Sequence, residues 1–348
     1  MVGEASKYLC GVIREAQVKR FGSLGIGDGN SEVYTIPYQE IAGVVSDTRQ
    51  VDFSSLLKET LAQFLVKHQA MIEQVMKTHT VIPVKFGTFL ESEESVKGIL
   101  RKGYPRLQAL LGQMEGKIEL DLVATWRDVK QELVKISQED PKIRQFKEAI
   151  EKKPPDKGLQ DRIAIGVMLK EALDQKRGQL QVQMLELLKA QAERLQPHDL
   201  MNDEMVLNCA CLIDRGREEQ FDRALHDLDS QFQGEINFRC VGPLPPYSFS
   251  TIEIKRADPA GLEAARALFG FGEEAKAQEI QERYRRLVRE RHPDRSPGDA
   301  QAQERFEELQ AAYQTLIEYC QGEKASFRKE EVRDSFIITL LDLTGTRA

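Results

Sequence analysis

Runs of apolar residues divide the first third of the chain into strands and helices. Four short apolar runs predict β-strands at residues 8–13, 33–36, 41–46 and 81–89. Between Ser55 and Lys77, apolar positions recur at the spacing of one helix face. A second helix follows Ser92, whose side chain we expect to cap it. This order of strands, helix, strand and helix predicts an α+β domain over residues 1–116.

The middle of the chain repeats this mixture, with a long helical interval inside it. Strands are predicted at residues 117–126, 204–213 and 234–241, with a helix at residues 217–231. The interval 128–200 is helical and highly charged, is broken at residues 152–158, and has its second arm at residues 159–195. We interpret it as an antiparallel helical hairpin inserted into a ferredoxin-like α+β domain over residues 117–256. Its charges indicate a solvated face, and a projecting arm of this kind also suits partner binding.

The last part of the chain predicts two antiparallel helices and an apolar tail. Residues 275–291 and 300–319 each carry an apolar stripe at helical spacing and are joined by a polar loop. We therefore expect a small helical hairpin domain over residues 257–322. In the tail, residues 323–348, the run 335–341 is too apolar for a free end. We expect this tail to pack back on the core as a strand or a helix.

The loop between these two helices begins with the tripeptide His292-Pro293-Asp294. With the segments 267–271, 282–287 and 305–313, this tripeptide resembles a J-domain, the module by which DnaJ-type co-chaperones engage DnaK-type ATPases. The tripeptide stands in register between two helices of the expected polarity, which makes the resemblance specific. Arg291 departs from the pattern, because the family usually has an aromatic residue before the histidine.

The helix before this loop has a basic face. Five arginines lie between residues 283 and 291, against the single acid Glu290. A face of this density steers an acidic partner, and the resemblance implies that the partner is a DnaK-type chaperone. The alternative is a solvated face in which the arginines pair with Glu304, Glu307 and Glu308 of the next helix. The residues that we expect to dock the chaperone are His292, Pro293, Asp294, Arg285, Arg286 and Arg289.

Composition limits the classes of protein that this chain belongs to. Its 348 residues suffice for two or three domains, and its net charge of −7 argues against nucleic-acid binding through the whole surface. No run of eighteen apolar residues predicts a membrane span, and the N-terminus lacks the apolar core of a signal peptide. Five cysteines, an odd number, are consistent with reduced thiols. We therefore expect a cytoplasmic protein with no membrane or nucleic-acid partner.

Candidate chemistry along the chain is sparse. The glycines at 25, 27 and 29 lack the spacing and the following helix of a phosphate loop. His68 lies on an apolar helix face without a second ligand four residues on, so we expect a hydrogen-bonded core histidine. Cys209, Cys211 and Cys240 lack zinc-site spacing and are expected to be buried as small apolar residues. Since no nucleophile-elbow, metalloprotease or Walker sequence occurs, we predict no enzyme, no cofactor and no metal site.

Two phrases within the first 256 residues carry a second resemblance. One is Val-Ile-Pro-Val-Lys-Phe-Gly-Thr at residues 81–88, and the other is Gly-Pro-Leu-Pro-Pro-Tyr-Ser-Phe at residues 242–249. With the opening strand, they follow the order of the GvpF/GvpL family of gas vesicle proteins, which the chain resembles over residues 6–256. The family-signature residues are Pro83, Phe86, Gly87, Gly242, Pro243, Pro245, Pro246, Tyr247 and Phe249. We interpret them as fold-forming positions and not as a binding site.

The resemblance implies a function in gas vesicles. Members of this family are accessory or minor structural components that associate with GvpA, a small shell protein that exposes an apolar face and is prone to aggregate. The first hypothesis is therefore a gas vesicle assembly factor that binds GvpA and other gas vesicle proteins, and recruits a DnaK-type chaperone. The alternative is a general J-domain co-chaperone whose first 256 residues bind unrelated clients. A shell-protein gene in the neighbourhood separates the two.

Overall fold

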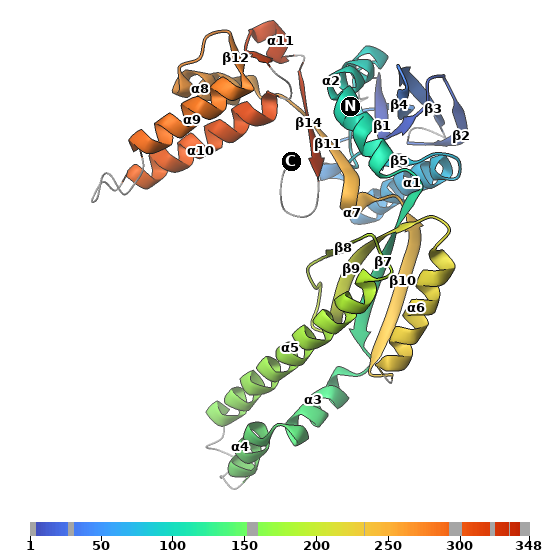
Figure 1. The fold of residues 1–348 in the computed structure, drawn as a ribbon, viewed down its shortest axis with the longest axis vertical. Helices are drawn as coiled ribbons and strands as arrows, with labels where there is room; N and C mark the ends of the chain where they lie inside the picture. Colours follow the sequence, from blue (N-terminus) through green and yellow to red (C-terminus); the bar gives the residue numbers. More distant parts are fainter. Residues whose placement is uncertain are drawn as a thin grey trace. The chain divides into compact units, whose positions relative to one another are not determined.

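The chain folds into two compact units. The computed structural model describes residues 5–26, 31–151, 159–232, 234–291, 301–320, 324–333 and 335–341. The first unit joins Met1–Gln113 to Ser250–Ala348, and the second is Met114–Phe249 (Figure 1). No helix within the described ranges is long and apolar enough to cross a membrane.

The N-terminal part of the first unit is a curled antiparallel sheet with two α-helices and one short 3-10 helix. Its strands are β1 (Ala5–Arg14), β2 (Arg20–Gly25), β3 (Ser31–Tyr38), β4 (Ile41–Arg49), β5 (Val81–Pro83) and β6 (Phe89–Leu90), and its helices are η1 (Phe53–Ser55), α1 (Lys58–Met76) and α2 (Glu93–Gln113). The sheet order is β2-β3-β4-β1-β5, and β6 also pairs with β1. The predicted cap is confirmed, because Ser92 Oγ accepts from Ser95 N at 3.1 Å. The single strand predicted at residues 81–89 is instead two short strands, interrupted at Gly87, whose φ is +87°.

The second unit is ferredoxin-like, as predicted. Its strands are β7 (Lys117–Trp126), β8 (Arg194–Pro197), β9 (Met205–Asp214) and β10 (Ile236–Leu244), and its helices are α3 (Val129–Glu139), α4 (Pro141–Glu151), α5 (Leu159–Lys189), α6 (Glu218–Gln231) and α7 (Tyr247–Ser250). The sheet order is β10-β7-β9-β8. Numbered along the unit, the strands follow the order 4-1-3-2, with α5 and α6 each connecting two of them. This is the βαββαβ arrangement of ferredoxin-like folds.

The helical interval differs from the predicted hairpin in two respects. Its first arm is two helices, α3 and α4, because Pro141 starts a new helix after Glu139. Its second arm is not wholly an insertion, since Met184 and Leu188 of α5 are fully buried and α5 contacts β8 and β9. The helix predicted to reach Leu195 ends at Lys189, and residues 194–197 form β8. Apolar residues continue at helical spacing through this change, so periodicity alone hides it.

The C-terminal helical segment, residues 257–335, is a helical domain with a small two-stranded sheet. Its elements are α8 (Pro259–Phe269), β12 (Glu274–Lys276), α9 (Ala277–Arg291), α10 (Ala302–Tyr319), β13 (Lys324–Ser326) and α11 (Lys329–Arg333). α8 begins after Asp258, whose side chain accepts from Ala260 N, and ends at Gly270, whose φ is +70°. The segment 267–271, which carries part of the J-domain resemblance as its first helix, extends beyond α8, because Phe271 follows the cap residue Gly270. The pairing of β12 with β13 was not predicted.

Two further strands flank this segment and lie beside the N-terminal sheet. β11 (Thr251–Arg256) pairs antiparallel with β14 (Phe336–Leu341), and Val84, next to β5, bridges to Ile252. The apolar run of the tail is therefore a strand. One of its side chains, Ile338, is 3% exposed and lies against α2, close to Gly103.

We predict that the packing of β14 stabilises the first unit. Replacing Ile338 by Ala should lower the free energy of unfolding by about 2–4 kcal/mol, because it leaves a cavity next to α2. The matched control is Thr339→Ala, whose side chain is only partly buried and which should change it by about 0.5 kcal/mol or less. Denaturant unfolding followed by circular dichroism measures both. Equal small effects of the two substitutions would show that the tail contributes nothing to the core.

Candidate functional site

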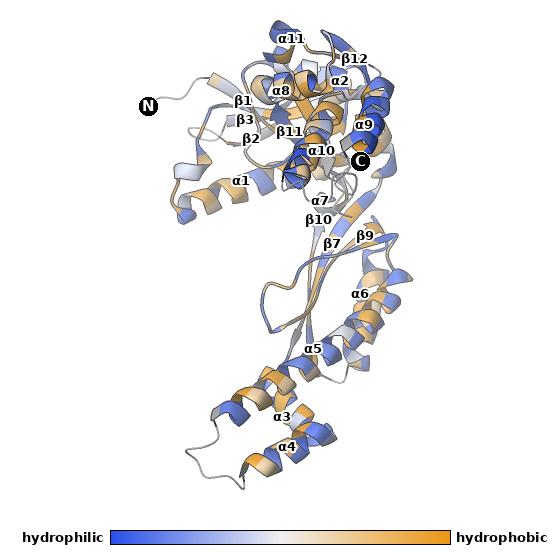
Figure 2. Ribbon diagram, turned by 90° about the vertical axis from the view of Figure 1, so that its left-hand side faces the viewer, coloured by the Kyte–Doolittle hydropathy of each residue, from blue (hydrophilic) through white to orange (hydrophobic). Residues whose placement is uncertain are grey.

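The predicted chaperone-docking face lies on α9. Arg285, Arg286 and Arg289 are exposed, whereas Leu287 between them is buried in the core of the C-terminal helical segment. Within the described part of the chain, none of the three arginines forms an ion pair or a side-chain hydrogen bond. α9 is drawn predominantly in blue in Figure 2, which marks its polar surface.

The helix that carries these arginines is held rigidly against its neighbours. Tyr284 of α9 stacks on Tyr313 of α10, with ring centroids 3.9 Å apart and an interplanar angle of 12°. Arg283, the neighbour of Tyr284, points the other way and donates from Nε to the Phe269 carbonyl at the end of α8 (3.0 Å). The face that bears Arg285, Arg286 and Arg289 is therefore fixed in orientation by both adjacent helices.

The other predicted docking residues form the tripeptide that follows α9. His292, Pro293 and Asp294 fall outside the described residues. The alternative pairing of the α9 arginines with α10 finds no support among the described residues, because Glu304, Glu307 and Glu308 form no ion pair with Arg285, Arg286 or Arg289. Among the described residues, Arg285, Arg286 and Arg289 therefore expose their charges to solvent.

The first signature phrase packs into an aromatic cluster of the N-terminal sheet. Phe86 lies 4.5 Å from Phe53, 5.5 Å from His68 and 6.4 Å from Tyr8, measured between ring centroids. The Tyr8 hydroxyl accepts from Gly87 N at 3.3 Å and lies 2.8 Å from Nδ1 of His68. Burial lowers the pKa of His68 to about 4, so the imidazole is neutral at neutral pH and shares a hydrogen bond with the Tyr8 hydroxyl. The prediction of a hydrogen-bonded core histidine is confirmed.

The second signature phrase is anchored on β7 by a buried glutamate. Glu119 is 1% exposed, and its two carboxyl oxygens accept from Ser248 N and Ser248 Oγ, both at 2.8 Å. His198 Nε2 lies 3.1 Å from the same hydroxyl. Because one side chain satisfies both donors of Ser248, the turn after β10 is held at a fixed position on the sheet.

The other residues of this phrase pack around that anchor. Pro245, Pro246 and Phe249 are buried, and the Arg194 guanidinium lies 5.3 Å from the Phe249 ring centroid. Gly242 approaches β7 so closely that an added Cβ would lie 2.4 Å from Cδ2 of Leu120 and 2.9 Å from the Glu119 carbonyl oxygen. Pro243 is exposed and follows a cis peptide bond. These contacts support the fold-forming interpretation of the phrase.

Glu119 also faces a second carboxyl group on its own strand. Burial raises the pKa of Glu119 to about 8, against the opposing effect of the two hydrogen bonds from Ser248, and the neighbouring Asp121 adds to the increase. Burial raises the pKa of Asp121 as well. Burial and the neighbouring carboxyl group thus favour the protonated form of Glu119 at neutral pH. Sequence reasoning missed this pair, although acids at positions 119 and 121 of a largely apolar strand were the available signal.

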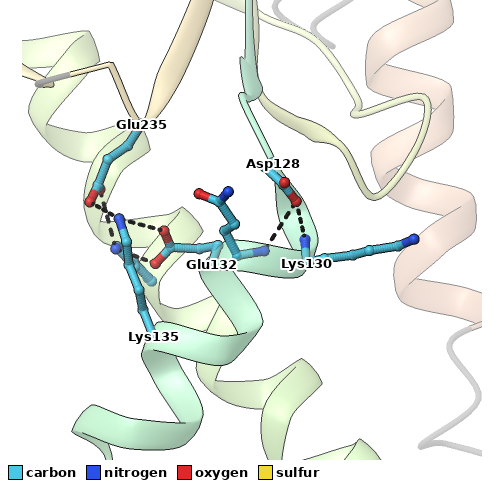
Figure 3. Close-up of polar contacts among 7 residues, drawn as sticks. Asp128, Lys130, Glu132, Lys135 and Glu235 are labelled. Atoms are coloured by element: carbon cyan, nitrogen blue, oxygen red, sulfur yellow. Dashed lines mark hydrogen bonds and ion pairs between the residues drawn. The ribbon is translucent and has the colours of Figure 1, made fainter.

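The root of the helical arm is closed by four alternating charges (Figure 3). Glu132 of α3 is 3% exposed and forms an ion pair with Lys176 of α5. Glu235, just before β10, accepts from Lys135 at 2.6 Å and lies 3.4 Å from Lys176. The Lys176 ammonium also lies 5.8 Å from the centroid of the Trp126 ring. This network joins α3, α5 and the start of β10 at a single point.

The three cysteines considered as candidate ligands, Cys209, Cys211 and Cys240, differ in exposure. Cys209 and Cys211 are buried as predicted, whereas Cys240 on the edge strand β10 is exposed, which corrects the prediction for that residue. β10 has a neighbour on one side only, so alternate positions along it remain open to solvent. Among the described residues, no three His, Cys, Asp or Glu side chains lie together in a way that could hold a metal ion.

Comparison with known proteins identifies the family. The family model "Gas vesicle synthesis protein GvpL/GvpF" matches residues 6–251, which is more than two thirds of the chain. The chain belongs to the GvpL/GvpF family. Gas vesicle protein F1 of Halobacterium salinarum (strain ATCC 700922 / JCM 11081 / NRC-1) is 24% identical over 229 residues, covering 65% of this chain and 84% of that protein. Gas vesicle protein F of Microcystis aeruginosa (strain PCC 7806) is 25% identical over 193 residues, covering 55% and 78%.

Solved GvpF structures share the fold. The crystal structure of GvpF from Anabaena sp. PCC7120 matches with a TM-score of 0.60 at 22% identity, covering 70% of this chain and 98% of that chain. GvpF from Microcystis aeruginosa gives a TM-score of 0.54 with the same identity and coverage. This GvpL/GvpF chain also carries a DnaJ domain, whose family model matches residues 267–321. Within it, 49 residues are 47% identical to chaperone protein DnaJ of Clostridioides difficile (strain 630), 14% of this chain and 13% of that protein.

We predict a stability that depends on the protonation of Glu119. The pKa of Glu119 in the folded protein, about 8, lies above its ordinary value of 4.5. The contribution of protonated Glu119 to the free energy of unfolding is therefore complete below pH 4.5 and is lost as the pH rises through 8. Glu119→Gln keeps one acceptor oxygen for Ser248, replaces the other by an amide group, and does not ionise. Relative to wild type, the variant should therefore gain thermal stability steadily between about pH 5 and pH 9.

The single tryptophan makes this measurement specific to the second unit. Trp126 lies on β7, the strand of Glu119, and is 4% exposed, so its fluorescence reports unfolding of this unit. The control is Glu253→Gln in the first unit, which should leave the pH dependence of the Trp126 transition unchanged. Parallel pH profiles for wild type and Glu119→Gln would contradict the assignment.

Proposed function

We propose that this GvpL/GvpF chain is a gas vesicle assembly factor that delivers a chaperone to the shell protein. The two α+β regions bind GvpA, and the DnaJ domain recruits a DnaK-type ATPase through α9 and the His292-Pro293-Asp294 loop. Membership of the GvpL/GvpF family together with a DnaJ domain supports both halves of this proposal. The protein acts in the cytoplasm, where the vesicle is built, and by binding, without catalysis of its own.

The observation that carries the proposal is the arginine face of α9. Arg285, Arg286 and Arg289 are exposed and have no partner among the described residues, and they precede the tripeptide by a few residues. Unpaired guanidinium groups on a rigid helix retain their full electrostatic attraction for an acidic surface. Arginines that served only to keep the helix soluble could equally well be paired with the acids of α10. The absence of such pairs among the described residues therefore favours a binding role.

The client-binding half is supported by exposed apolar side chains on the helical arm. Val134 of α3 and Ile163, Val167 and Val182 of α5 are each more than half exposed. Ile163 and Val167 stand four residues apart, so they share one face of α5. An apolar face on a projecting helix suits a shell protein that itself exposes an apolar surface before assembly.

We predict that the chain stimulates the ATPase activity of a DnaK-type chaperone. His292→Gln should abolish this stimulation, and Arg286→Glu should weaken it by about tenfold, since charge reversal replaces attraction by repulsion. Single-turnover ATP hydrolysis measures the effect. Lys130→Glu, an equal change of charge on the exposed side of α3, is the control and should retain full stimulation. If the wild-type chain stimulates no DnaK-type ATPase, the DnaJ domain is a structural appendage.

We also predict that the full chain keeps GvpA in solution and that the arm contributes to this. Ile163→Asp combined with Val167→Asp should reduce the amount of soluble GvpA at least about threefold, because two exposed apolar contacts are lost. Sedimentation of GvpA in the presence of each variant measures it. The control is Lys170→Asp on the same helix, because Lys170 is exposed and already polar, so the substitution removes no apolar contact.

An unrelated aggregation-prone client distinguishes the alternative function. If the chain protects that client as well as it protects GvpA, a general co-chaperone describes it better. If it protects neither, the client-binding half of the proposal is wrong, whatever the result of the ATPase measurement.

A further inference from the structure

An apolar groove lies in the C-terminal helical segment, away from the arginine face of α9. It has a volume of about 430 Å³ and is lined by residues of α8 and α11 and by Phe327. The helices α8 and α11 contact each other and lie side by side in Figures 1 and 2. Its floor consists of the apolar side chains of Leu262, Phe327 and Val332, all of which are buried, and Ala260 is exposed at its edge. A volume of this size accommodates a few side chains of a ligand.

The charged residues at the groove are unbalanced. Lys329 and Arg333 of α11 line it, and neither forms an ion pair or a side-chain hydrogen bond with any residue in the described ranges. The one carboxylate in the lining, Glu263, is already held by Arg266, whose Nε and Nη2 donate to it at 2.9 and 2.5 Å. Hydrogen bonding to Arg266 lowers the pKa of Glu263, and Lys329 adds a smaller electrostatic effect. The two cations that line the groove thus outnumber its one acid, which Arg266 already pairs.

The basic and acidic side chains of the short helix α11 lie on different sides of the helix, and only the basic ones line the groove. Lys329, Val332 and Arg333 occupy positions i, i+3 and i+4 and line the groove together. Glu330 and Glu331 stand between them in sequence and do not line it. The acids of α11 therefore do not compensate the two cations at the groove, and the helix presents one apolar residue flanked by two positive charges.

We propose that this groove binds a short peptide segment in which apolar side chains are flanked by carboxylates. The apolar residues of such a segment fill the space over Leu262, Phe327 and Val332, and its carboxylates pair with Lys329 and Arg333. An apolar floor selects the first feature, and the two unpaired cations select the second. This site is separate from the arginine face of α9, so it stands whether or not the chain stimulates a DnaK-type ATPase.

Four labelled hexapeptides test the proposal with the full-length chain. The probe is Gly-Glu-Leu-Leu-Asp-Gly, and its matched controls change one feature each: Gly-Gln-Leu-Leu-Asn-Gly removes the charge, Gly-Glu-Ser-Ser-Asp-Gly removes the apolar side chains, and Gly-Lys-Leu-Leu-Lys-Gly reverses the charge. Fluorescence anisotropy up to about millimolar protein measures each dissociation constant, because a groove of this size gives weak affinity. We expect binding of the first peptide only, with affinity that falls as salt is added.

Substitutions in the groove then locate the site. Lys329→Glu and Arg333→Glu should each weaken binding of the acidic-apolar peptide by about tenfold. Ala260→Trp should abolish it by filling the groove from its exposed edge. Arg286→Glu on α9 is the control and should leave peptide binding unchanged, just as the three groove variants should leave ATPase stimulation unchanged.

Each other outcome overturns the proposal in a defined way. Equal binding of the acidic-apolar and neutral peptides, or no binding of any peptide, shows that the two cations select nothing. Unchanged binding in Ala260→Trp shows that the peptide binds elsewhere. If the wild-type chain self-associates and Lys329→Glu or Ala260→Trp makes it monomeric in sedimentation, the occupant is a second copy of this chain.

Discussion

The pairing of β11 with β14 is the constraint on which the arrangement of the first unit depends. The C-terminal helical segment leaves β11 at Ala257 and returns to β14 at Ser335, and these two residues are joined by a hydrogen bond from Ala257 N to Ser335 O at 3.0 Å. The DnaJ domain is therefore inserted between two neighbouring antiparallel strands, so both of its ends are tied. A domain attached in this way has less freedom than one at the end of a flexible linker.

That pair of strands is itself held by the N-terminal sheet. Lys85 N donates to the Ile252 carbonyl at 2.8 Å, and the Lys85 ammonium lies 2.5 Å from Glu253, which is 8% exposed. Lys85 belongs to the first signature phrase, so a phrase typical of GvpL/GvpF proteins also supports the strand that leads to the DnaJ domain. Residues that form the fold in this family thereby position an additional domain in this chain.

The sequence was most informative where one local pattern determines one element. The strand β7 and the cap at Ser92 follow directly from local patterns, and the ferredoxin-like order follows from the succession of strands and helices. β8, β12 and β13 were not predicted, because three or four residues carry too little periodicity to distinguish a strand from a turn. The partnership of Glu119 with Ser248 was equally hidden, since it joins residues 129 positions apart. Only tertiary structure brings a strand acid and a turn serine together.

Charge provides the link between the DnaJ domain and its surroundings. The chain as a whole is acidic, with a net charge of −7, yet its exposed and unpaired cations include Arg285, Arg286 and Arg289 on α9 and Lys329 and Arg333 on α11. An acidic partner is repelled by the net charge of such a molecule and attracted at these faces, which favours correct orientation during the encounter. The two faces differ in what surrounds the charge. The α9 face is polar and suits a broad electrostatic contact, whereas the α11 face borders an apolar groove and suits a ligand that buries side chains. The two surfaces have the same sign of charge but different hydrophobicity, so under the two proposals the C-terminal helical segment would take different classes of acidic ligand at α9 and at α11.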